Sequence, residues 1–264
     1  MIGGQTPFGS DPSFLNLVQE MGLDPLKAAP GGGGEGVPHI PPHGTTVVAL
    51  RFAEGVVMAG DRRAVEGYSI ADNRMDKVFL ADDHSAVGIA GVAGQAVELV
   101  RLFQTELEHY EKVEGDALSL EGKANRLAQL IRASMPLVMQ GLVVVPIYAG
   151  YDFRRAEGRI FRYDAIGGRY EEADYNATGS GSRDAKASLK KTWRPDLDRS
   201  GAIEAAVESL LDASEADTAT GGPDPIRGIF PSVFVVTAEG VQETPDEEVR
   251  LSYEALAGRR EIRP

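Results

Sequence analysis

The residue arrangements that usually supply a nucleophile and a general base are scarce in this chain. It contains no cysteine, and two of its four histidines, His39 and His43, lie near the amino terminus. His84 falls in a polar turn and His109 on the polar face of an expected helix, so surface roles are expected for both. The Gly-x-Ser-x-Gly, His-Glu-x-x-His and Walker motifs are also missing. These absences disfavour the common hydrolases and nucleotide enzymes, and we expect no metal and no cofactor.

One reaction needs neither cysteine nor histidine: the α-amine of an N-terminal threonine can take the proton from that residue's own hydroxyl. Its reference pKa of about 7.7–8.0 suits this work at neutral pH. Thr45 would become such a residue if the chain were cleaved after Gly44, and until then its nitrogen would be an amide. Taken alone, Gly44-Thr45-Thr46 is explained more simply as a flexible tail joined to a first β-strand.

The composition of the chain changes near residue 44. Residues 1–44 contain 10 of the 31 glycines and 7 of the 15 prolines. A short helix is expected over residues 10–21, followed by a glycine-rich stretch whose entropy opposes ordering. That stretch matches the Gly-x-Gly-x-x-Gly dinucleotide fingerprint, but no strand precedes it and no helix follows. We therefore predict a removable arm over residues 1–44 and a catalytic domain over residues 45–264.

Hydrophobic periodicity gives a coarse order of elements in that domain. Strands are expected at 45–52, 56–60, 77–80, 85–90, 142–151, 158–163, 170–177, 233–238 and 241–243, with helices at 96–110, 120–139, 183–191 and 201–213. A turn is expected at 166–169, and the chain is expected to close on the last pair of strands. Two helices between groups of strands favour antiparallel sheets with helical layers over a doubly wound parallel sheet.

Charge and hydropathy limit the possible partners. The 264 residues carry a formal net charge of −13, which argues against a nucleic-acid or anionic-membrane surface. The longest apolar runs are much shorter than the roughly 20 residues of a spanning helix, and no secretory signal is recognisable. We expect a cytoplasmic protein with no membrane and no nucleic-acid partner.

Several separately spaced motifs occur together in this sequence. In order along the chain they are Gly44-Thr45-Thr46-Val47-Val48, Ala59-Gly60-Asp61-Arg62-Arg63, Asp76-Lys77-Val78, Gly88-Ile89-Ala90-Gly91, Thr178-Gly179-Ser180-Gly181-Ser182 and the stretch from Asp217 to Asp224. The sequence from Gly44 to about residue 245 resembles the β-subunits of 20S proteasomes, specifically the bacterial (actinobacterial) kind. The resemblance implies the α+β Ntn-hydrolase fold, a four-layer αββα sandwich of two antiparallel sheets between helical layers.

The resemblance also implies roles for individual residues in a threonine endopeptidase. Gly44 and Thr45 match the cleavage site, and Thr45 matches the nucleophile. Asp61 and Lys77 match the supporting acid and base, and Gly91 matches the residue whose backbone N–H forms the oxyanion hole. The residues that match the hydrogen-bonding groups around the amine are Ser180, Asp217 and Thr220, the last of which is serine in many members. The residues that match the pocket for the side chain before the cut are Ala64, Val65, Met75, Ile89, Ala93 and Val97, all apolar.

By the same resemblance, the β-subunits would form homo-heptameric rings stacked with rings of α-subunits. An ATPase ring would feed in proteins tagged with a prokaryotic ubiquitin-like protein. Two alternatives share the superfamily. A two-ring peptidase that pairs with an unfoldase also begins Thr-Thr, but its chain is shorter and lacks a long arm. A non-catalytic ring subunit would keep the fold, although such subunits usually lack the intact set formed by Gly44, Thr45, Asp61, Lys77 and Gly91.

Overall fold

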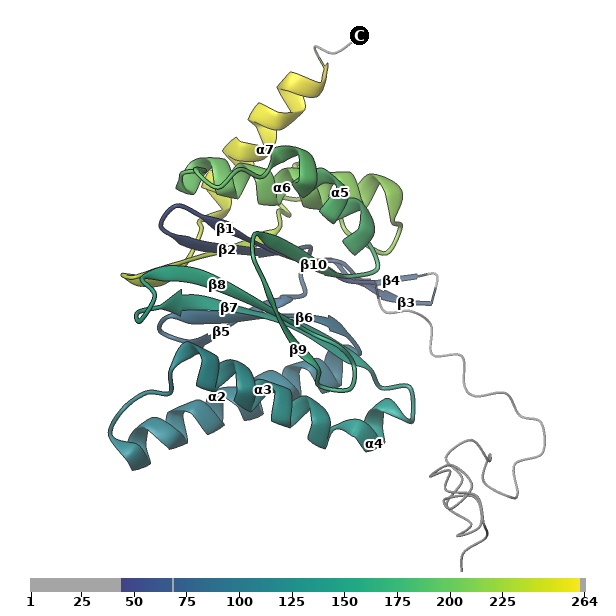
Figure 1. The fold of residues 1–264 in the computed structure, drawn as a ribbon. Coiled ribbons are helices and arrows are strands. Elements are labelled where there is room, and N and C mark those ends of the chain that lie inside the picture. Colours follow the sequence, from purple (N-terminus) through teal and green to yellow (C-terminus); the bar gives the residue numbers. More distant parts are fainter. Residues whose placement is uncertain (1–43, 68, 262–264) are drawn as a thin grey trace, which may run out of the picture. The chain divides into compact units, whose positions relative to one another are not determined.

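The computed structural model describes residues 44–67 and 69–261. The expected arm, with its short helix at residues 10–21, therefore lies outside the described residues except for Gly44. In the described part of the chain, two five-stranded antiparallel sheets are stacked between layers of helices (Figure 1). This arrangement confirms the predicted αββα sandwich.

Each sheet is built from strands that are distant in the sequence. The first sheet has the order β10-β1-β2-β11-β12, namely Tyr175–Gly179, Thr46–Phe52, Gly55–Gly60, Ser232–Thr237 and Gly240–Glu243. The second has the order β5-β6-β7-β8-β9, namely Val78–Asp82, Ser85–Gly91, Val144–Asp152, Glu157–Tyr163 and Arg169–Glu172. A separate small hairpin pairs β3 (Ala64–Glu66) with β4 (Ser69–Asp72).

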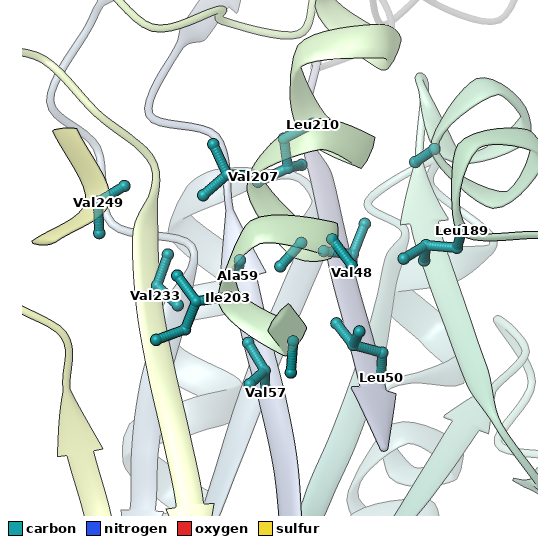
Figure 2. Packing of buried hydrophobic residues seen from close by; sticks show 14 of the residues in the cluster. Val48, Leu50, Val57, Ala59, Leu189, Ile203, Val207, Leu210, Val233 and Val249 are labelled. Carbon is teal, nitrogen blue, oxygen red and sulfur yellow. The ribbon is translucent and has the colours of Figure 1, made fainter. Parts of the chain in front are cut away.

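The helices cover the outer faces of the two sheets. Those over the first sheet are α5 (Ser182–Thr192) and α6 (Arg199–Ala216), with α7 (Asp246–Glu261) packed against α6, and those on the side of the second are α2 (Ala93–Glu114), α3 (Leu120–Ala133) and the short α4 (Met135–Val138). The alternation of side chains along β1 explains the layers. Val48 and Leu50 pack against α5 and α6 (Figure 2), whereas Val47 and Ala49 face the second sheet. Both faces of the strand are therefore buried.

Two predicted elements were wrong because local breaks divide them. The helix expected over 120–139 ends at Ala133, and Pro136 lies in the separate helix α4. Proline lacks an amide hydrogen and its ring clashes with the preceding helical turn, so one continuous helix is disfavoured. The strand expected over 170–177 is two strands, β9 and β10, which belong to different sheets.

Three further elements, the strands β3 and β4 and the helix α7, were not predicted. The hairpin of β3 and β4 is short and largely exposed, so its sequence carries little hydrophobic pattern. The chain also does not close on β12, because the acidic stretch that follows begins helix α7. Three acidic residues lie in the first turn of this helix and two arginines in the last, which matches the helix dipole. Val249 and Leu256 of α7 are buried in the hydrophobic cluster that the first sheet forms with its helices.

Candidate active site

The predicted nucleophile, Thr45, immediately precedes β1, which lies between β10 and β2 in the first sheet. Thr46 is paired with Gly179 of β10, and Val47 with Gly60 of β2. Thr45 is 6% exposed, and its carbonyl accepts a 2.9 Å hydrogen bond from the amide of Ser180. The start of β1 therefore places Thr45 beside the residues that follow β2 and β10.

The hydroxyl of Thr45 faces the peptide bond that we expect to be cleaved. Its Oγ1 donates to the carbonyl oxygen of Gly44 at 2.7 Å. Lys77 Nζ donates to the same oxygen at 3.4 Å. A Cβ on Gly44 would lie 2.1 Å from the Cβ of Ala219, so only glycine fits at this position. The Gly44 carbonyl oxygen thus accepts hydrogen bonds from a hydroxyl and from an ammonium group.

Asp61 and Lys77 form a buried ion pair next to Thr45. Asp61 directly follows β2 and Lys77 directly precedes β5, and their charged atoms are 2.7 Å apart with side chains 0% and 2% exposed. Asp61 also accepts three backbone N–H groups, from Thr46, Arg63 and Gly221, at 2.8, 3.0 and 2.8 Å. Burial lowers the pKa of Lys77, although Asp61 opposes this effect. Lys77 is therefore closer to losing its proton than an exposed lysine.

A second carboxylate, Asp217, lies at the end of α6. It accepts hydrogen bonds from Ser180 Oγ at 2.5 Å, Thr220 Oγ1 at 2.6 Å and the amide of Ala219 at 3.1 Å. Burial alone would raise the pKa of Asp217, but these bonds and the charge of Lys77 outweigh it and lower the pKa. The three residues predicted to surround the amine, Ser180, Asp217 and Thr220, are thus joined to one another.

Among the described residues, no group of histidine, cysteine, aspartate and glutamate side chains is arranged to hold a metal ion. In residues 44–67 and 69–261, no helix is both long and apolar enough to cross a membrane.

Residues 42–226 of the sequence match the Proteasome subunit family. The chain belongs to this family. It is 55% identical over 255 residues to a proteasome subunit beta of Acidimicrobium ferrooxidans, a match that covers 96% of this chain and 92% of that protein. A proteasome subunit beta of Jonesia denitrificans is 52% identical over 221 residues, covering 84% of this chain and 73% of that protein. Because the first match covers 96% of the chain, it extends into residues 1–44.

These matches confirm the resemblance to bacterial proteasome β-subunits. As a proteasome β-subunit, the chain is a threonine endopeptidase of the 20S core particle, which also contains rings of α-subunits. The matches do not assign roles to single residues, so the catalytic and pocket residues remain predictions.

The predicted oxyanion residue of this proteasome subunit, Gly91, ends strand β6 with a φ of 129°. An added Cβ would lie 2.1 Å from the carbonyl oxygen of Val143, so both its conformation and its surroundings require glycine. Gly91 is not a partner in the hydrogen bonds given for Thr45, Asp61, Lys77 and Asp217. Its role in binding an oxyanion remains a prediction.

The six predicted pocket residues come from four regions of the subunit. Ala64 and Val65 lie in β3, Met75 lies between β4 and β5, and Ala93 and Val97 lie in α2, and all five are partly exposed. Ile89 differs, because it is 5% exposed and packs within the apolar cluster beneath α2. It contributes to the core there, and a role in the pocket remains a prediction for all six.

Sequence reasoning missed several groups that complete the site. The amides of Arg63 and Gly221 hold Asp61, and the carbonyl of Arg63 accepts a hydrogen bond from Lys77. Backbone contacts of this kind leave no residue-type signal. The hydroxyl of Thr46 was also missed, although the repeated threonine after Gly44 was visible in the sequence.

Proposed function

We propose that this proteasome subunit is made as a precursor and becomes active when Thr45 cleaves the chain after Gly44. The observation that carries the proposal is the double contact on the Gly44 carbonyl, from the Thr45 hydroxyl at 2.7 Å and from Lys77 at 3.4 Å. A reacting oxygen and a stabilising cation are thus held at the same peptide bond.

The cleavage would follow from this geometry. Attack of Thr45 Oγ1 on the carbonyl carbon of Gly44 forms a C–O bond, and negative charge develops on the oxygen that Lys77 contacts. The C–N bond then breaks as the nitrogen takes up the proton that the Thr45 hydroxyl has given up. Water hydrolyses the resulting ester, which leaves a carboxylate on Gly44 and a free amine on Thr45.

In the mature subunit the new α-amine would act as the base. It takes the proton from Thr45 Oγ1, which attacks the substrate carbonyl to form an acyl ester, and the proton passes to the departing amine. Water then hydrolyses the ester, which releases the second product as a carboxylate and restores the Thr45 hydroxyl. The positive charge of Lys77 disfavours protonation of the α-amine and so keeps it basic. Asp61 holds Lys77, Gly91 donates its N–H to the oxyanion, and Ser180, Asp217 and Thr220 orient the amine.

The specificity, the assembly and the delivery of substrates are inferred from the resemblance and from the apolar pocket residues. Ala64, Val65, Met75, Ile89, Ala93 and Val97 would favour cleavage after apolar residues. The subunits would form homo-heptameric rings enclosed by α-rings in the cytoplasm, with an ATPase ring delivering proteins tagged with a prokaryotic ubiquitin-like protein. Enclosure has a physical reason, because a permissive protease must be kept away from folded cellular proteins.

The experiment that tests the processing is N-terminal sequencing of the assembled particle, together with its peptidase activity. We expect the chain to begin Thr45-Thr46, and we expect Thr45→Ala to keep residues 1–44 and lose activity. Thr105→Ala, which removes an exposed hydroxyl on α2 bonded to its own helix, is the matched control and should change neither. An active particle that retained the arm would reject the mechanism. An inactive wild-type particle that retained it would support the structural-subunit alternative.

A panel of fluorogenic peptides tests the specificity separately. Peptides with leucine, phenylalanine or tyrosine before the cut should have a higher kcat/KM than those with arginine or glutamate. A preference for either charged residue would reject the six pocket residues without affecting the assignment of Thr45.

A further inference from the structure

Thr46, the residue after the proposed nucleophile, has a buried side chain inside the active-site network. It is 0% exposed. Its Oγ1 accepts a 2.9 Å hydrogen bond from the amide of Gly181 and lies 2.7 Å from Thr220 Oγ1. Thr220 Oγ1 in turn lies 2.6 Å from Asp217. Four groups therefore form one continuous chain that ends on a carboxylate.

The direction of every hydrogen bond in this chain is fixed. The Asp217 carboxylate is ionised and can only accept, so the single hydroxyl hydrogen of Thr220 must point toward it. The bond between the two threonines must then be donated by Thr46. The Thr46 oxygen in turn accepts a hydrogen bond from the Gly181 amide. Hydrogen bonds aligned in this way polarise one another and strengthen the last bond to the carboxylate.

The packing around the hydroxyls of Thr46 and Thr220 leaves just enough room for their contact. Gly181 is the N-terminal cap residue of α5, and an added Cβ there would lie 2.7 Å from both Thr46 Oγ1 and Thr220 Oγ1. Only glycine leaves room for the pair. The first residue of β1, the start of α5 and the loop after α6 thus meet at Thr46.

Thr46 also contacts the other carboxylate of the site. Its backbone amide donates to Asp61 Oδ1 at 2.8 Å, the same oxygen that accepts the bond from Lys77. The amide of Thr46 therefore binds one carboxylate directly, and its hydroxyl supports the second through Thr220. Both carboxylates act electrostatically on Lys77.

We propose that the hydroxyl of Thr46 is a positioning group for the peptidase reaction, acting through Thr220 to hold Asp217 ionised and in place beside Thr45. This inference rests on the proposed function of Thr45. Its consequence concerns pH: without the Thr46 hydroxyl, Thr220 is a poorer donor, and Asp217 is protonated at a higher pH than in the wild type.

The test uses two pairs of variants in the assembled particle, each pair differing by one hydroxyl group. Wild type is compared with Thr46→Val, and Thr46→Ser with Thr46→Ala. In each pair we expect loss of the hydroxyl to lower kcat at least about tenfold, with little change in KM, because the hydrogen bond to Thr220 is lost and the Gly181 amide loses its acceptor. We also expect the acid limb of the pH–kcat profile to move to higher pH, which a purely structural defect would not cause.

A matched control is available in Thr244, whose buried hydroxyl makes no hydrogen bond. Thr244→Val should leave kcat, KM and the pH profile unchanged. If the valine variant at position 46 does not assemble, the serine and alanine variants decide the question. Equal kcat values and pH profiles within a pair would overturn the inference. Thr45→Ala in the same assay reports on the proposed function, because only activity in that variant would reject the threonine mechanism itself.

Discussion

Lys77 illustrates at the scale of one residue how burial and charge produce a reactive group. The side chain is 2% exposed and lies 2.7 Å from Asp61. Removal of one partner from a buried ion pair typically costs about 3–5 kcal/mol, because the other charge is left uncompensated. Here three backbone amides also hold Asp61, so the loss of stability should be at the lower end of that range.

We predict that Lys77→Ala allows assembly but lowers kcat by at least about a hundredfold, since it removes the charge beside the reacting carbonyl. The measurement is kcat on a fluorogenic peptide, with assembly checked by size-exclusion chromatography. Lys123→Ala is the control, because Lys123 forms a 2.8 Å ion pair with Asp82 elsewhere in the fold. Undiminished turnover in Lys77→Ala would show that the Asp61–Lys77 pair is only structural.

The elements of the fold show what the sequence pattern can and cannot predict. Strands buried on both faces, such as β1 and β2, have continuous apolar runs and were predicted within one residue or two. The division of residues 170–177 between two sheets left no such signal, because apolar and polar residues alternate from Ala173 to Ala177 straight through the bend at Ala173 and Asp174. Helix α7 was missed because its apolar stripe is narrow, although its acidic first turn is typical of the start of a helix.

Gly44, which precedes β1, packs closely against Ala219 in the loop after α6. We predict that Gly44→Ala slows release of residues 1–44 at least about tenfold, because the added Cβ would lie 2.1 Å from the Cβ and 2.4 Å from the carbonyl oxygen of Ala219. A time course of the intact mass measures this. Gly258→Ala, with no atom within 4 Å of the added Cβ, should process normally. Normal processing of Gly44→Ala would show that the loop moves aside freely.

Arg159 joins three neighbouring strands of the second sheet. It is 2% exposed, lies on β8 and bonds Asp152 of β7 at 2.7 Å and Glu171 of β9 at 2.6 Å. Burial raises the pKa of Asp152, but Arg159 and two backbone amides lower it further than burial raises it. For Glu171, the hydrogen bond from Arg159 is the largest cause of a lowered pKa. Both carboxylates are thus more acidic in the folded state than in the unfolded chain.

The sign of the pH effect follows from these shifts. Stability from a lowered carboxylate pKa is complete above the unfolded values of 3.8 and 4.5 and is lost as the pH falls through the folded values. We predict that the Tm falls as the pH is lowered from about 5 to about 3, and that Arg159→Met has a lower Tm at neutral pH and a flatter dependence. Arg194→Met, which removes an exposed arginine bonded to backbone carbonyls, is the control. Parallel profiles for the wild type and Arg159→Met would contradict this account.

At the scale of the whole molecule, the topology brings together site residues that are distant in the sequence. Thr45, Asp61 and Lys77 lie at the ends of three strands, and Asp217 follows a helix far along the chain. Spacing in the sequence does not show that these residues meet, so their common site was accessible only through resemblance to a known family. The contacts made by backbone amides could not have been predicted even then, because any residue type can supply them.

Net charge gives a last prediction for the assembled particle. After Gly44 the chain has 36 acidic and 26 basic residues, a net charge of −10 for each subunit. A field of this sign attracts cationic substrates and repels anionic ones, and salt screens it, with a Debye length of about 10 Å at 0.1 M. Three peptides with the same residue before the cut but net charges of about +2, 0 and −2 should therefore respond differently to salt.

Between about 20 mM and about 300 mM salt, we expect kcat/KM to fall for the cationic peptide, rise for the anionic one and stay nearly constant for the neutral one. The effect should be confined to KM, because screening changes the approach of the substrate and leaves the buried Asp61–Lys77 pair unaffected. The neutral peptide is the internal control for any effect of salt on assembly. If all three peptides showed the same dependence, the acidic balance of the subunit would have no part in delivering substrate to Thr45, and the local surface around the site would determine access instead.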